Sequence, residues 1–290
     1  MTHALDPIIV AADGGGSGCR ACAGTLSRGI LAHARGGPGN VHSDFDGAVR
    51  NLTGAVREAL AKAGMAEADP RAITAHFGVA GAHTPGEMAA VQAALPYGQT
   101  SVTGDRATSV RGVLGSADGY VVALGTGTII ARQDCLETRT VGGWGFDLSD
   151  QASGAWLGLR LCQETVLVED GLRPATDLSA QILSELGGLA GLIALSTGAR
   201  PATYAPLART VVEAAAQGDG LGRDLMLEGA GYVTRALHHL GYAPGDLLSL
   251  AGGLGPHYAP YLAEDLTRNL QPPRGTALDG AFAMALEAVK

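Results

Sequence analysis

A glycine-rich turn directly after a short apolar run constrains this chain more than any other feature. Residues 8–12 (IIVAA) read as a strand, and residues 13–18 (DGGGSG) follow at once. Glycine accepts positive φ and lets a ligand approach the main chain, so the N–H groups of such a turn can cradle a phosphate. Ser17 can add a hydroxyl, and Asp13 can hold a hydrated Mg²⁺. The alternative is a plain hairpin turn that Asp13 caps itself.

Composition limits the class of protein. The chain has 290 residues, which suits two domains, and 46% of them are apolar. Its 44 glycines lie mostly in turns between apolar runs. A formal charge of −8 without a long Lys/Arg cluster argues against nucleic acid or a membrane surface as the partner. No apolar run reaches the roughly 20 residues that span a bilayer, and no signal peptide is recognisable, so we expect a cytoplasmic protein.

Two of the four cysteines, Cys19 and Cys22, have the spacing of a metal or redox motif. They fall in a predicted strand, where residues three apart point to opposite faces. We therefore expect buried or half-buried thiols there rather than a metal or redox site. The other two cysteines are Cys135 and Cys162.

The first third of the chain predicts an α/β layout with a mixed sheet. Three strands form an antiparallel meander with short turns, and helices then alternate with strands. The helix over residues 47–63 carries Val49, Leu52, Val56 and Leu60 on one face. The predicted strands are 8–13, 18–26, 29–35, 73–79 and 101–103, and the predicted helices are 47–63, 86–94 and 106–114.

A second glycine turn repeats the first pattern. An apolar strand over 120–124 leads into residues 125–128 (GTGT), and strands over 129–132 and 138–141 follow. We interpret the two units as a duplicated domain with two facing phosphate loops, and a chance pair of hairpins is the alternative. Residues 153–243 read as mainly helical, 247–251 as a strand closed by Gly252-Gly253, and 277–289 as an apolar helix.

The order of these motifs resembles the sugar-kinase branch of the actin/hexokinase superfamily. The motifs are DGGGS at 13–17, Gly104-Asp105, LGTGT at 124–128 and AGG at 251–253. Within that branch the chain resembles the N-acetylglucosamine kinase and BadF/BadG/BcrA/BcrD ATPase group. Residues 141–154 (VGGWGFDLSDQASG), with the segment that continues to 174, are similar to bacterial glucosamine kinases.

The resemblance implies two RNase H-like (actin-like ATPase) domains with ATP and sugar in a central cleft. We expect the first domain over residues 1–113 and 275–290, because the last helix is expected to return to it. It would hold one phosphate loop, the sugar site and the catalytic aspartate. The second, over 114–274, would hold the other phosphate loop, an adenosine loop and a helical insert. The family also implies a homodimer.

Asp105 is the predicted catalytic base. It lies between a short strand and a helix, at the edge of the expected cleft, and it matches the family's catalytic aspartate. Phosphoryl transfer needs in-line positioning, charge neutralisation and a base near the attacking hydroxyl. The alternative is an ordinary helix N-cap, with Thr108 and Ser109 just downstream.

ATP binding must work here without a phosphate-loop lysine. Neither glycine turn contains Lys and no GxxxxGK[ST] motif occurs, so the chain is not a P-loop enzyme. We expect main-chain N–H groups, hydroxyls and Mg²⁺ to balance the charge of ATP, with Asp13 holding the metal through water. The resemblance makes Gly252-Gly253 the adenosine loop. The predicted ATP-binding residues are Gly14, Gly15, Gly16, Ser17, Gly125, Thr126, Gly127, Thr128, Gly252 and Gly253.

The resemblance assigns sugar binding to Asn40 and Asp150. Gln151 stands where animal-type N-acetylglucosamine kinases have Glu, which favours the glucosamine-kinase pattern. Trp144, in GGWG, instead follows the N-acetylglucosamine-kinase pattern; Trp144 and Trp156 can equally be core residues. The predicted sugar-binding residues are Asn40, Asp105, Gly143, Trp144, Asp150 and Gln151.

These motifs together predict an ATP-dependent amino-sugar kinase that converts glucosamine into glucosamine 6-phosphate. N-acetylglucosamine kinase is the alternative within the class. An ATPase that activates a radical enzyme would need thiolates for an iron–sulfur cluster, and no cysteine lies in 142–154. A sugar-responsive repressor would need an N-terminal DNA-binding helix–turn–helix, and the first strand begins at about residue 8.

Overall fold

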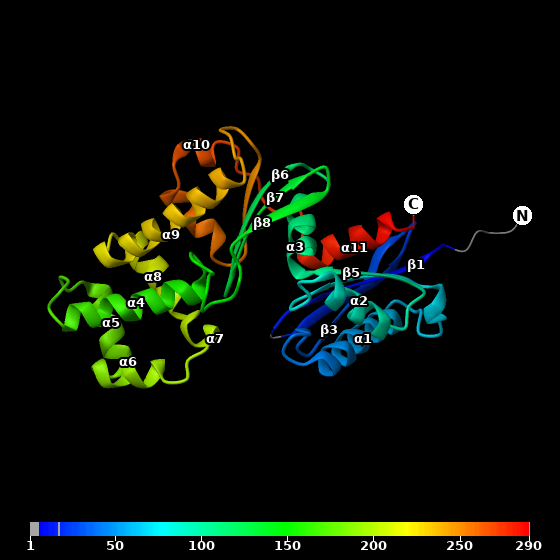
Figure 1. Ribbon diagram of the computed structural model, residues 1–290, viewed down its shortest axis with the longest axis horizontal. Coiled ribbons are helices and arrows are strands. Elements are labelled where there is room, and N and C mark those ends of the chain that lie inside the picture. The colour runs from blue at the N-terminus through cyan, green and yellow to red at the C-terminus, as the bar shows by residue number, and fades with distance from the viewer. Residues whose placement is uncertain (1–5, 17, 290) are drawn as a thin grey trace, which may run out of the picture. The chain divides into compact units, whose positions relative to one another are not determined.

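The computed structural model describes residues 6–16 and 18–289, and it divides into two compact units (Figure 1). Unit 1 runs up to Ala117 and takes back the chain from Pro273 onward, and unit 2 is Asp118–Pro272. The boundaries expected near 113 and 275 lie close to these positions.

Unit 1 is built on a five-stranded sheet in the order β3-β2-β1-β4-β5. The first three strands pair antiparallel, whereas β1, β4 and β5 run parallel. Parallel neighbours need crossover connections, which helices supply here. The strands are β1 (Ile8–Gly14), β2 (Cys19–Thr25), β3 (Gly29–Gly36), β4 (Thr74–Val79) and β5 (Gln99–Gly104).

Helices cover both faces of this sheet. Helices α1 (Phe45–Lys62) and α2 (Pro85–Ala94) supply Leu52, Val56 and Val91 to one core, which also holds Phe77 of β4. On the other face α11 (Ala277–Glu287) packs along β1 and against α3 (Asp105–Leu114). A short 3₁₀ helix, η1 (Pro70–Ala72), leads into β4.

Cys19 and Cys22 point to opposite faces of the sheet, as the strand period requires. Cys19 lies in the core beneath α1, and Cys22 lies in the core beneath α11. Burial raises the pKa of both thiols, that of Cys22 to about 12. The expectation of buried thiols is confirmed.

Unit 2 repeats the meander with a four-stranded sheet in the order β8-β7-β6-β9. Strands β6, β7 and β8 pair antiparallel, and β9 lies parallel to β6. The strands are β6 (Gly119–Leu124), β7 (Thr128–Asp134), β8 (Glu137–Val141) and β9 (Leu248–Ala251).

A helical segment separates β8 from β9, as the sequence predicts. Leu157, Val211, Leu225 and Tyr258 join the inner face of β6 and β9 in one buried core. The elements are α4 (Gly154–Glu169), α5 (Asp177–Leu186), α6 (Gly188–Ser196), α7 (Pro201–Tyr204), α8 (Leu207–Ala216) and α9 (Gly220–His239), followed after β9 by η2 (Gly255–Tyr261) and α10 (Glu264–Thr267).

In the part of the chain that the structure describes, no single helix is long and apolar enough to cross a membrane. Helices α5 and α6 meet that test only as a pair, with a 75° bend between them. The bend falls at Gly187, which has a φ of +81° and ends α5.

Candidate active site

The carboxyl ends of the parallel strands in unit 1 bring the predicted site residues of that unit together. Gly14 lies opposite Val79 on β4, and Val79 lies opposite Gly104 on β5. Asp13 and Asp105 therefore flank the same edge of the sheet, which is where ligands bind in open α/β sheets.

Asp105 is the first residue of α3, but its side chain does not cap the helix. The N-cap is Gly104, which has no side-chain cap. The hydroxyls of Thr108 and Ser109 donate to the main-chain carbonyl of Asp105 rather than to its carboxylate. The structure therefore gives no support to the N-cap interpretation of this aspartate.

The carboxyl of Asp105 is half-buried, and its surroundings raise its pKa. Burial is the main cause, the nearby charge of Asp13 adds to it, and Arg106 and His83 oppose it. A carboxylate with a raised pKa accepts a proton more readily than an ordinary aspartate, provided that the pH stays above that pKa. Asp105 thus has the electrostatics of a general base.

Asp13 is buried at the end of β1, and its carboxylate pairs with the guanidinium of Arg20. Arg20 Nη2 lies 2.5 Å from Asp13 Oδ2. The two residues are directly opposite each other in the β1–β2 ladder. The sequence analysis missed Arg20, although the hairpin register, counted back from the glycine turn, could have found it.

The glycine turn itself is closely held by its neighbours. Gly15 N–H donates to the carbonyl of Gly18, and Gly39 N–H donates to the carbonyl of Gly15, both at 2.9 Å. A Cβ on Gly14 would stand 2.9 Å from the Gly39 carbonyl, so only glycine fits there. A Cβ on Gly16 would meet nothing within 4 Å, and Ser17 lies outside the described residues.

Asn40 lies in the loop after β3, next to the glycine turn. Its Oδ1 accepts hydrogen bonds from the main-chain N–H groups of His42 and Ser43, at 2.9 and 3.2 Å. Gly81 approaches so closely that a Cβ there would stand 2.6 Å from Asn40 Oδ1. The loop therefore fixes Asn40 beside the carboxyl end of β4, with Nδ2 as its remaining donor group.

In unit 2 the second glycine turn is tied to the start of α4. Gly154 N–H donates to the carbonyl of Gly125 at 2.7 Å, and Gly125 N–H donates to that of Gly127. Thr126 is exposed, but Thr128 is buried and donates its hydroxyl to the carbonyl of Gln151 at 2.7 Å. Of the two predicted threonines, only Thr126 presents an exposed side chain to a ligand.

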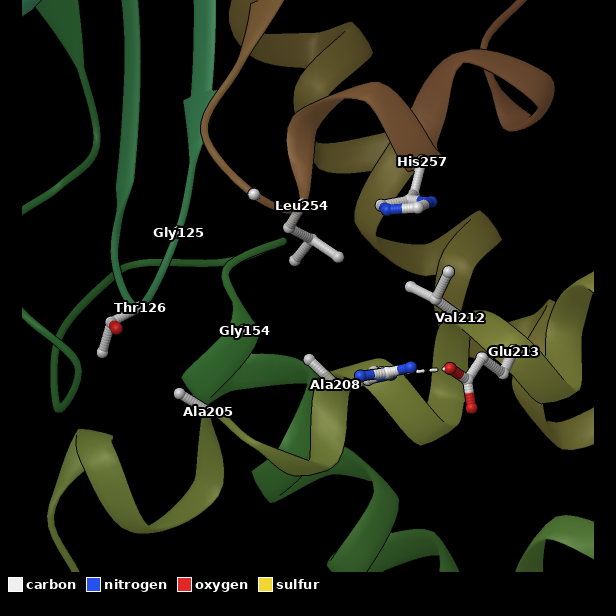
Figure 2. A pocket seen from close by; sticks show the side chains of 11 residues that line it. Gly125, Thr126, Gly154, Ala205, Ala208, Val212, Glu213, Leu254 and His257 are labelled. Carbon is white, nitrogen blue, oxygen red and sulfur yellow. Dashed lines mark hydrogen bonds and ion pairs between the residues drawn. The ribbon is translucent and has the colours of Figure 1, made fainter.

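A pocket of about 530 Å³ opens beside this turn (Figure 2). Its wall is largely apolar, with Ala208 and Val212 from α8 and Leu254 after β9. Polar groups stand at its rim: His257 from η2, and the exposed pair in which Arg209 Nε donates to Glu213 Oε1 at 2.7 Å. The sequence analysis named none of these residues, because they come from segments far apart in the chain.

The predicted adenosine loop lines the same pocket through Gly253. Gly252 has a φ of +76°, and a Cβ there would stand 2.2 Å from the carbonyl of Leu124. Glycine is therefore required at this position for two separate reasons. The backbone of Gly252 packs directly on the strand that leads into the second glycine turn.

The loop between β8 and α4 carries four predicted sugar-binding residues. Trp144 is 68% exposed, which rules it out as a core residue. Asp150 has a φ of +64°, uncommon outside glycine, and its Oδ2 lies 3.1 Å from where a Cβ of Gly127 would be. Gln151 gives its main-chain carbonyl to Thr128. The structure thus brings Asp150 and Gln151 to the second glycine turn and leaves Trp144 on the surface.

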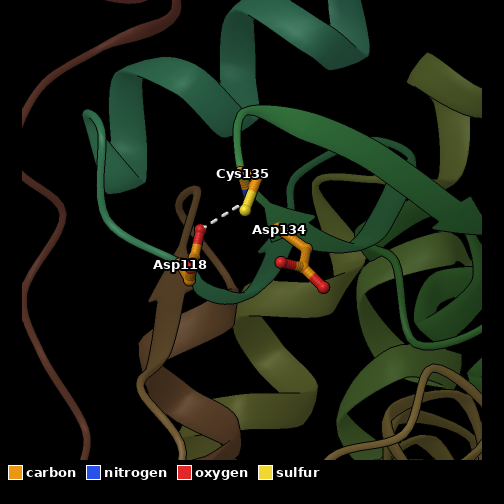
Figure 3. Close-up of side chains that lie close together, drawn as sticks. All are labelled: Asp118, Asp134 and Cys135. Atoms are coloured by element: carbon orange, nitrogen blue, oxygen red, sulfur yellow. Dashed lines mark hydrogen bonds between the residues drawn. The ribbon is translucent and has the colours of Figure 1, made fainter.

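The predicted metal residue Asp13 is not part of a preformed group of three ligands. Among the described residues, metal-ligating atoms gather instead at Asp118, Asp134 and Cys135, within 4.8 Å of one another (Figure 3). All three residues are exposed, and Asp118 accepts a hydrogen bond from the N–H of Cys135. A magnesium ion that also binds nucleotide phosphates needs only one or two carboxylates, so Asp13 still fits that role.

The sequence model of the BadF/BadG/BcrA/BcrD ATPase family matches residues 11–262, which is most of the chain. The chain belongs to the BadF/BadG/BcrA/BcrD ATPase family. The match spans both glycine turns, Asp105 and the pocket of unit 2. The family predicted from the sequence is confirmed.

Similar proteins agree with this assignment. Glucosamine kinase GspK of Vibrio cholerae is 27% identical over 281 residues, covering 95% of each chain. The structure of a candidate N-acetylglucosamine kinase from Chromobacterium violaceum matches with a TM-score of 0.86 and 28% identity, over 97% of this chain and 99% of that one. An ROK hexokinase from Thermus thermophilus shares the fold at a TM-score of 0.57 and 15% identity, covering 97% and 98%. The predicted α/β fold of actin-like ATPases is thereby confirmed for this BadF/BadG/BcrA/BcrD family member.

Proposed function

We propose that this protein is an ATP-dependent amino-sugar kinase that phosphorylates glucosamine on its 6-hydroxyl. The observation that carries the proposal is the position of Asp105. Its half-buried carboxylate does not cap a helix, and it lies at the same sheet edge as Asp13 and the first glycine turn. Membership of an ATPase family and the similarity to glucosamine kinase GspK support the reaction class.

In the proposed reaction Asp105 takes the proton of the sugar hydroxyl as the oxygen attacks the γ-phosphorus of ATP. The new O–P bond forms while the bond from the γ-phosphorus to the β–γ bridging oxygen breaks, and ADP leaves. Phosphoryl transfer depends mainly on positioning and charge stabilisation, so the base contributes about 10²–10⁴-fold rather than the whole acceleration.

Asp13 is proposed to hold the magnesium ion, through water. When bound, the ion neutralises charge on the transferring phosphate. Asp13 is buried and lies close enough to Asp105 for its charge to raise the pKa of Asp105. A cation near both carboxylates would offset that repulsion, so the donor set fits a hard divalent ion.

The nucleotide is proposed to bind in the pocket of unit 2. The apolar wall of Ala208, Val212 and Leu254 suits a flat purine ring, and the exposed rim suits a ribose. Gly125, Thr126 and Gly127 would then offer main-chain N–H groups and one hydroxyl to the phosphates. Gly252 and Gly253 allow the main chain to approach the adenosine without an intervening Cβ.

Sugar recognition is proposed for Asn40 in unit 1 and for the loop that carries Gly143, Trp144, Asp150 and Gln151 in unit 2. Asn40 can donate through Nδ2 and Asp150 can accept through its carboxylate, which is the pairing that sugar hydroxyls need. The positive φ of Asp150 is a strained conformation of the kind that persists at ligand sites.

N-acetylglucosamine kinase is the second candidate. The exposed Trp144 favours it, because an aromatic surface can cover the acetyl methyl group, and the Chromobacterium violaceum structure is described as a candidate enzyme of that type. A methyl-sized contact is worth only ~1–3 kcal/mol, so a single residue does not decide between the sugars.

Transfer from ATP with Mg²⁺ to a panel of hexoses tests the proposal. We expect kcat/KM to be highest for glucosamine, and a higher value for N-acetylglucosamine would replace the first candidate by the second. Absence of transfer to any hexosamine would reject both. An iron content near zero in the purified protein is expected as well, since Cys19, Cys22 and Cys162 are buried and only Cys135 is exposed.

A further inference from the structure

A second pocket, of about 450 Å³, lies on unit 1 at the outer edge of β3. We call it the basic pocket, and its polar lining consists of Arg20 on β2, His33 and Arg35 on β3, and Lys62 and Glu58 at the end of α1. Three permanent positive charges therefore meet one carboxylate. Lys62 Nζ pairs with Glu58 at 2.6 Å and Arg20 pairs with Asp13 at 2.5 Å, which leaves Arg35 as the excess charge.

The two arginines face each other across the sheet. Arg20 and Arg35 are directly opposite in the β2–β3 ladder, so both side chains leave the same face. Like charges at such positions destabilise a strand pair. Arg20 has Asp13 as a partner, whereas Arg35 has no hydrogen bond or ion pair in the described part of the chain.

Arg20 connects the basic pocket to the candidate active site. One of its nitrogens binds Asp13 at 2.5 Å, and its side chain remains 49% exposed. A guanidinium has five N–H donors, so Arg20 can hold Asp13 and a second anion together. Asp279, which caps the start of α11 beside Leu278, is the other acid near this face.

We propose that the basic pocket binds a small phosphate-bearing anion, with Arg20 and Arg35 as its main ligands. Opposite residues of a strand pair stand about 4.5–5.5 Å apart at Cβ, so two guanidinium forks can converge on one phosphate. The pocket is too small for a folded partner, and the net charge of −8 argues against a nucleic acid backbone. Inorganic phosphate and the phosphate of a sugar ester share the chemistry required.

An anion on the free donors of Arg20 neutralises part of the charge that Arg20 presents to Asp13. Asp13 then carries more uncompensated charge and attracts a divalent cation more strongly. This link to the metal rests on the proposed function of Asp13, whereas anion binding itself does not. The basic pocket thus couples the level of phosphate or phosphorylated sugar to the metal affinity of the candidate active site.

The β7–β8 hairpin of unit 2 supplies a matched control. Arg132 and Arg139 are also directly opposite each other there. One arginine of each pair has an acidic partner, which for Arg132 is Asp134 at 2.8 Å. The surroundings differ, because the pocket beside this pair adds Glu137 where the basic pocket adds Lys62. This hairpin has the same arginine pair with its charge balanced, so it is not expected to bind phosphate.

The test is calorimetric titration of inorganic phosphate into the full chain, with glucosamine and a non-hydrolysable ATP analogue present. We expect Arg35→Gln to weaken binding at least about tenfold, because a charged hydrogen-bonding partner is lost. Arg139→Gln should bind as the wild type does. Phosphate should also raise the Tm of the wild type and of Arg139→Gln but not that of Arg35→Gln. No binding, or binding that Arg35→Gln leaves unchanged, overturns the proposal.

Two further titrations identify the anion that binds and test the link to the metal site. Tighter binding of glucosamine 6-phosphate than of inorganic phosphate, again dependent on Arg35, assigns the site to the sugar ester, and equal binding assigns it to the phosphate alone. Calorimetric titration of Mg²⁺ should show several-fold tighter binding with phosphate present. An unchanged Mg²⁺ affinity overturns the link between the basic pocket and the metal. If the protein binds phosphate through Arg35 but has no kinase activity, only the proposed function is overturned.

Discussion

The two units contain the same construction and use it differently. Each has a hairpin whose glycine turn ends a central strand, a third antiparallel strand, and a parallel strand on the other side. In unit 1 the strand ends in Asp13-Gly14, and in unit 2 it ends in Ala123-Leu124. The backbone supplies the turn in both, and the carboxylate of Asp13 makes unit 1 the candidate for metal binding.

The residues that follow the parallel strands extend this difference. In unit 1 the outer parallel strand, β5, leads to Asp105, whereas in unit 2 the parallel strand β9 leads to Gly252 and an apolar pocket. The comparison teaches that a repeated backbone does not repeat its chemistry. The two carboxylates proposed for metal binding and proton transfer lie in unit 1, and the apolar pocket proposed for the purine ring lies in unit 2. Three of the predictions below change one unit and use the other as a control.

The largest effect is expected from Asp105→Asn, which removes the proposed base. We expect kcat to fall at least about 100-fold with an unchanged Tm. Asp177→Asn is the control, because Asp177 is likewise the first residue of a helix but lies exposed in unit 2. Near-normal turnover in Asp105→Asn would remove this residue from catalysis.

The pH dependence of kcat should report the same carboxyl group. Burial raises the pKa of Asp105, so the base becomes protonated, and activity is lost, at a higher pH than for an ordinary aspartate. Below that pKa the rate should fall about tenfold per pH unit. An acid limb below the usual range of aspartate would contradict this assignment.

Gly252→Ala should disrupt unit 2 where Gly253→Ala does not. A Cβ at Gly252 meets the Leu124 carbonyl and requires positive φ, whereas one at Gly253 meets nothing within 4 Å. We expect Gly252→Ala to lower the free energy of unfolding by about 1–3 kcal/mol and to raise KM for ATP. Equal denaturation midpoints for the two variants would show that the contact is relieved elsewhere.

Asp13→Asn should weaken the metal requirement of unit 1 rather than its fold. We expect about tenfold more Mg²⁺ for half-maximal rate, since Asp13 is proposed to act through water. Asp134→Asn is the matched control, because it breaks the corresponding pair with Arg132 in unit 2. The proposal fails if both variants show the wild-type Mg²⁺ dependence.

The smallest effect is expected from Arg35→Gln without any anion. Removing one of two opposed charges should stabilise unit 1 by about 0.2–1 kcal/mol, measured by denaturant unfolding. Arg139→Gln should bring no such gain, because acidic neighbours already balance that pair. Destabilisation by Arg35→Gln would indicate an attractive role for Arg35 in the folded protein.

Most of the fold could be predicted because its signals are local. Alternating apolar runs ending in glycine predict strands and turns, and β1 to β9 lie within a few residues of their expected positions. The helices α5, α6 and α7 were not separated in advance, because Gly187 and Pro201 break a helical segment whose packing depends on distant partners.

In the candidate site, too, residues with local signals could be predicted and residues that depend on distant contacts could not. Asp105 and Asp13 were predicted because Asp105 directly follows a strand and Asp13 stands near the end of one. Arg20 escaped prediction because its role depends on the register between strands, and Thr128 was expected to contact ATP although its hydroxyl binds Gln151. His257 and Arg209 could not be paired from the sequence, since 47 residues and a strand separate them.

The hydrogen bonds between the second glycine turn and the β8–α4 loop have a consequence for protein engineering. Thr128 binds Gln151, and Gly125 binds Gly154, so the α4 end of the proposed sugar loop is fastened at two points to the proposed phosphate turn. A designer who grafts a loop from a relative to alter sugar choice therefore also alters the ATP half of the enzyme. Grafts that include residues 124–154 as one cassette should keep turnover, and grafts of the loop alone should lose it.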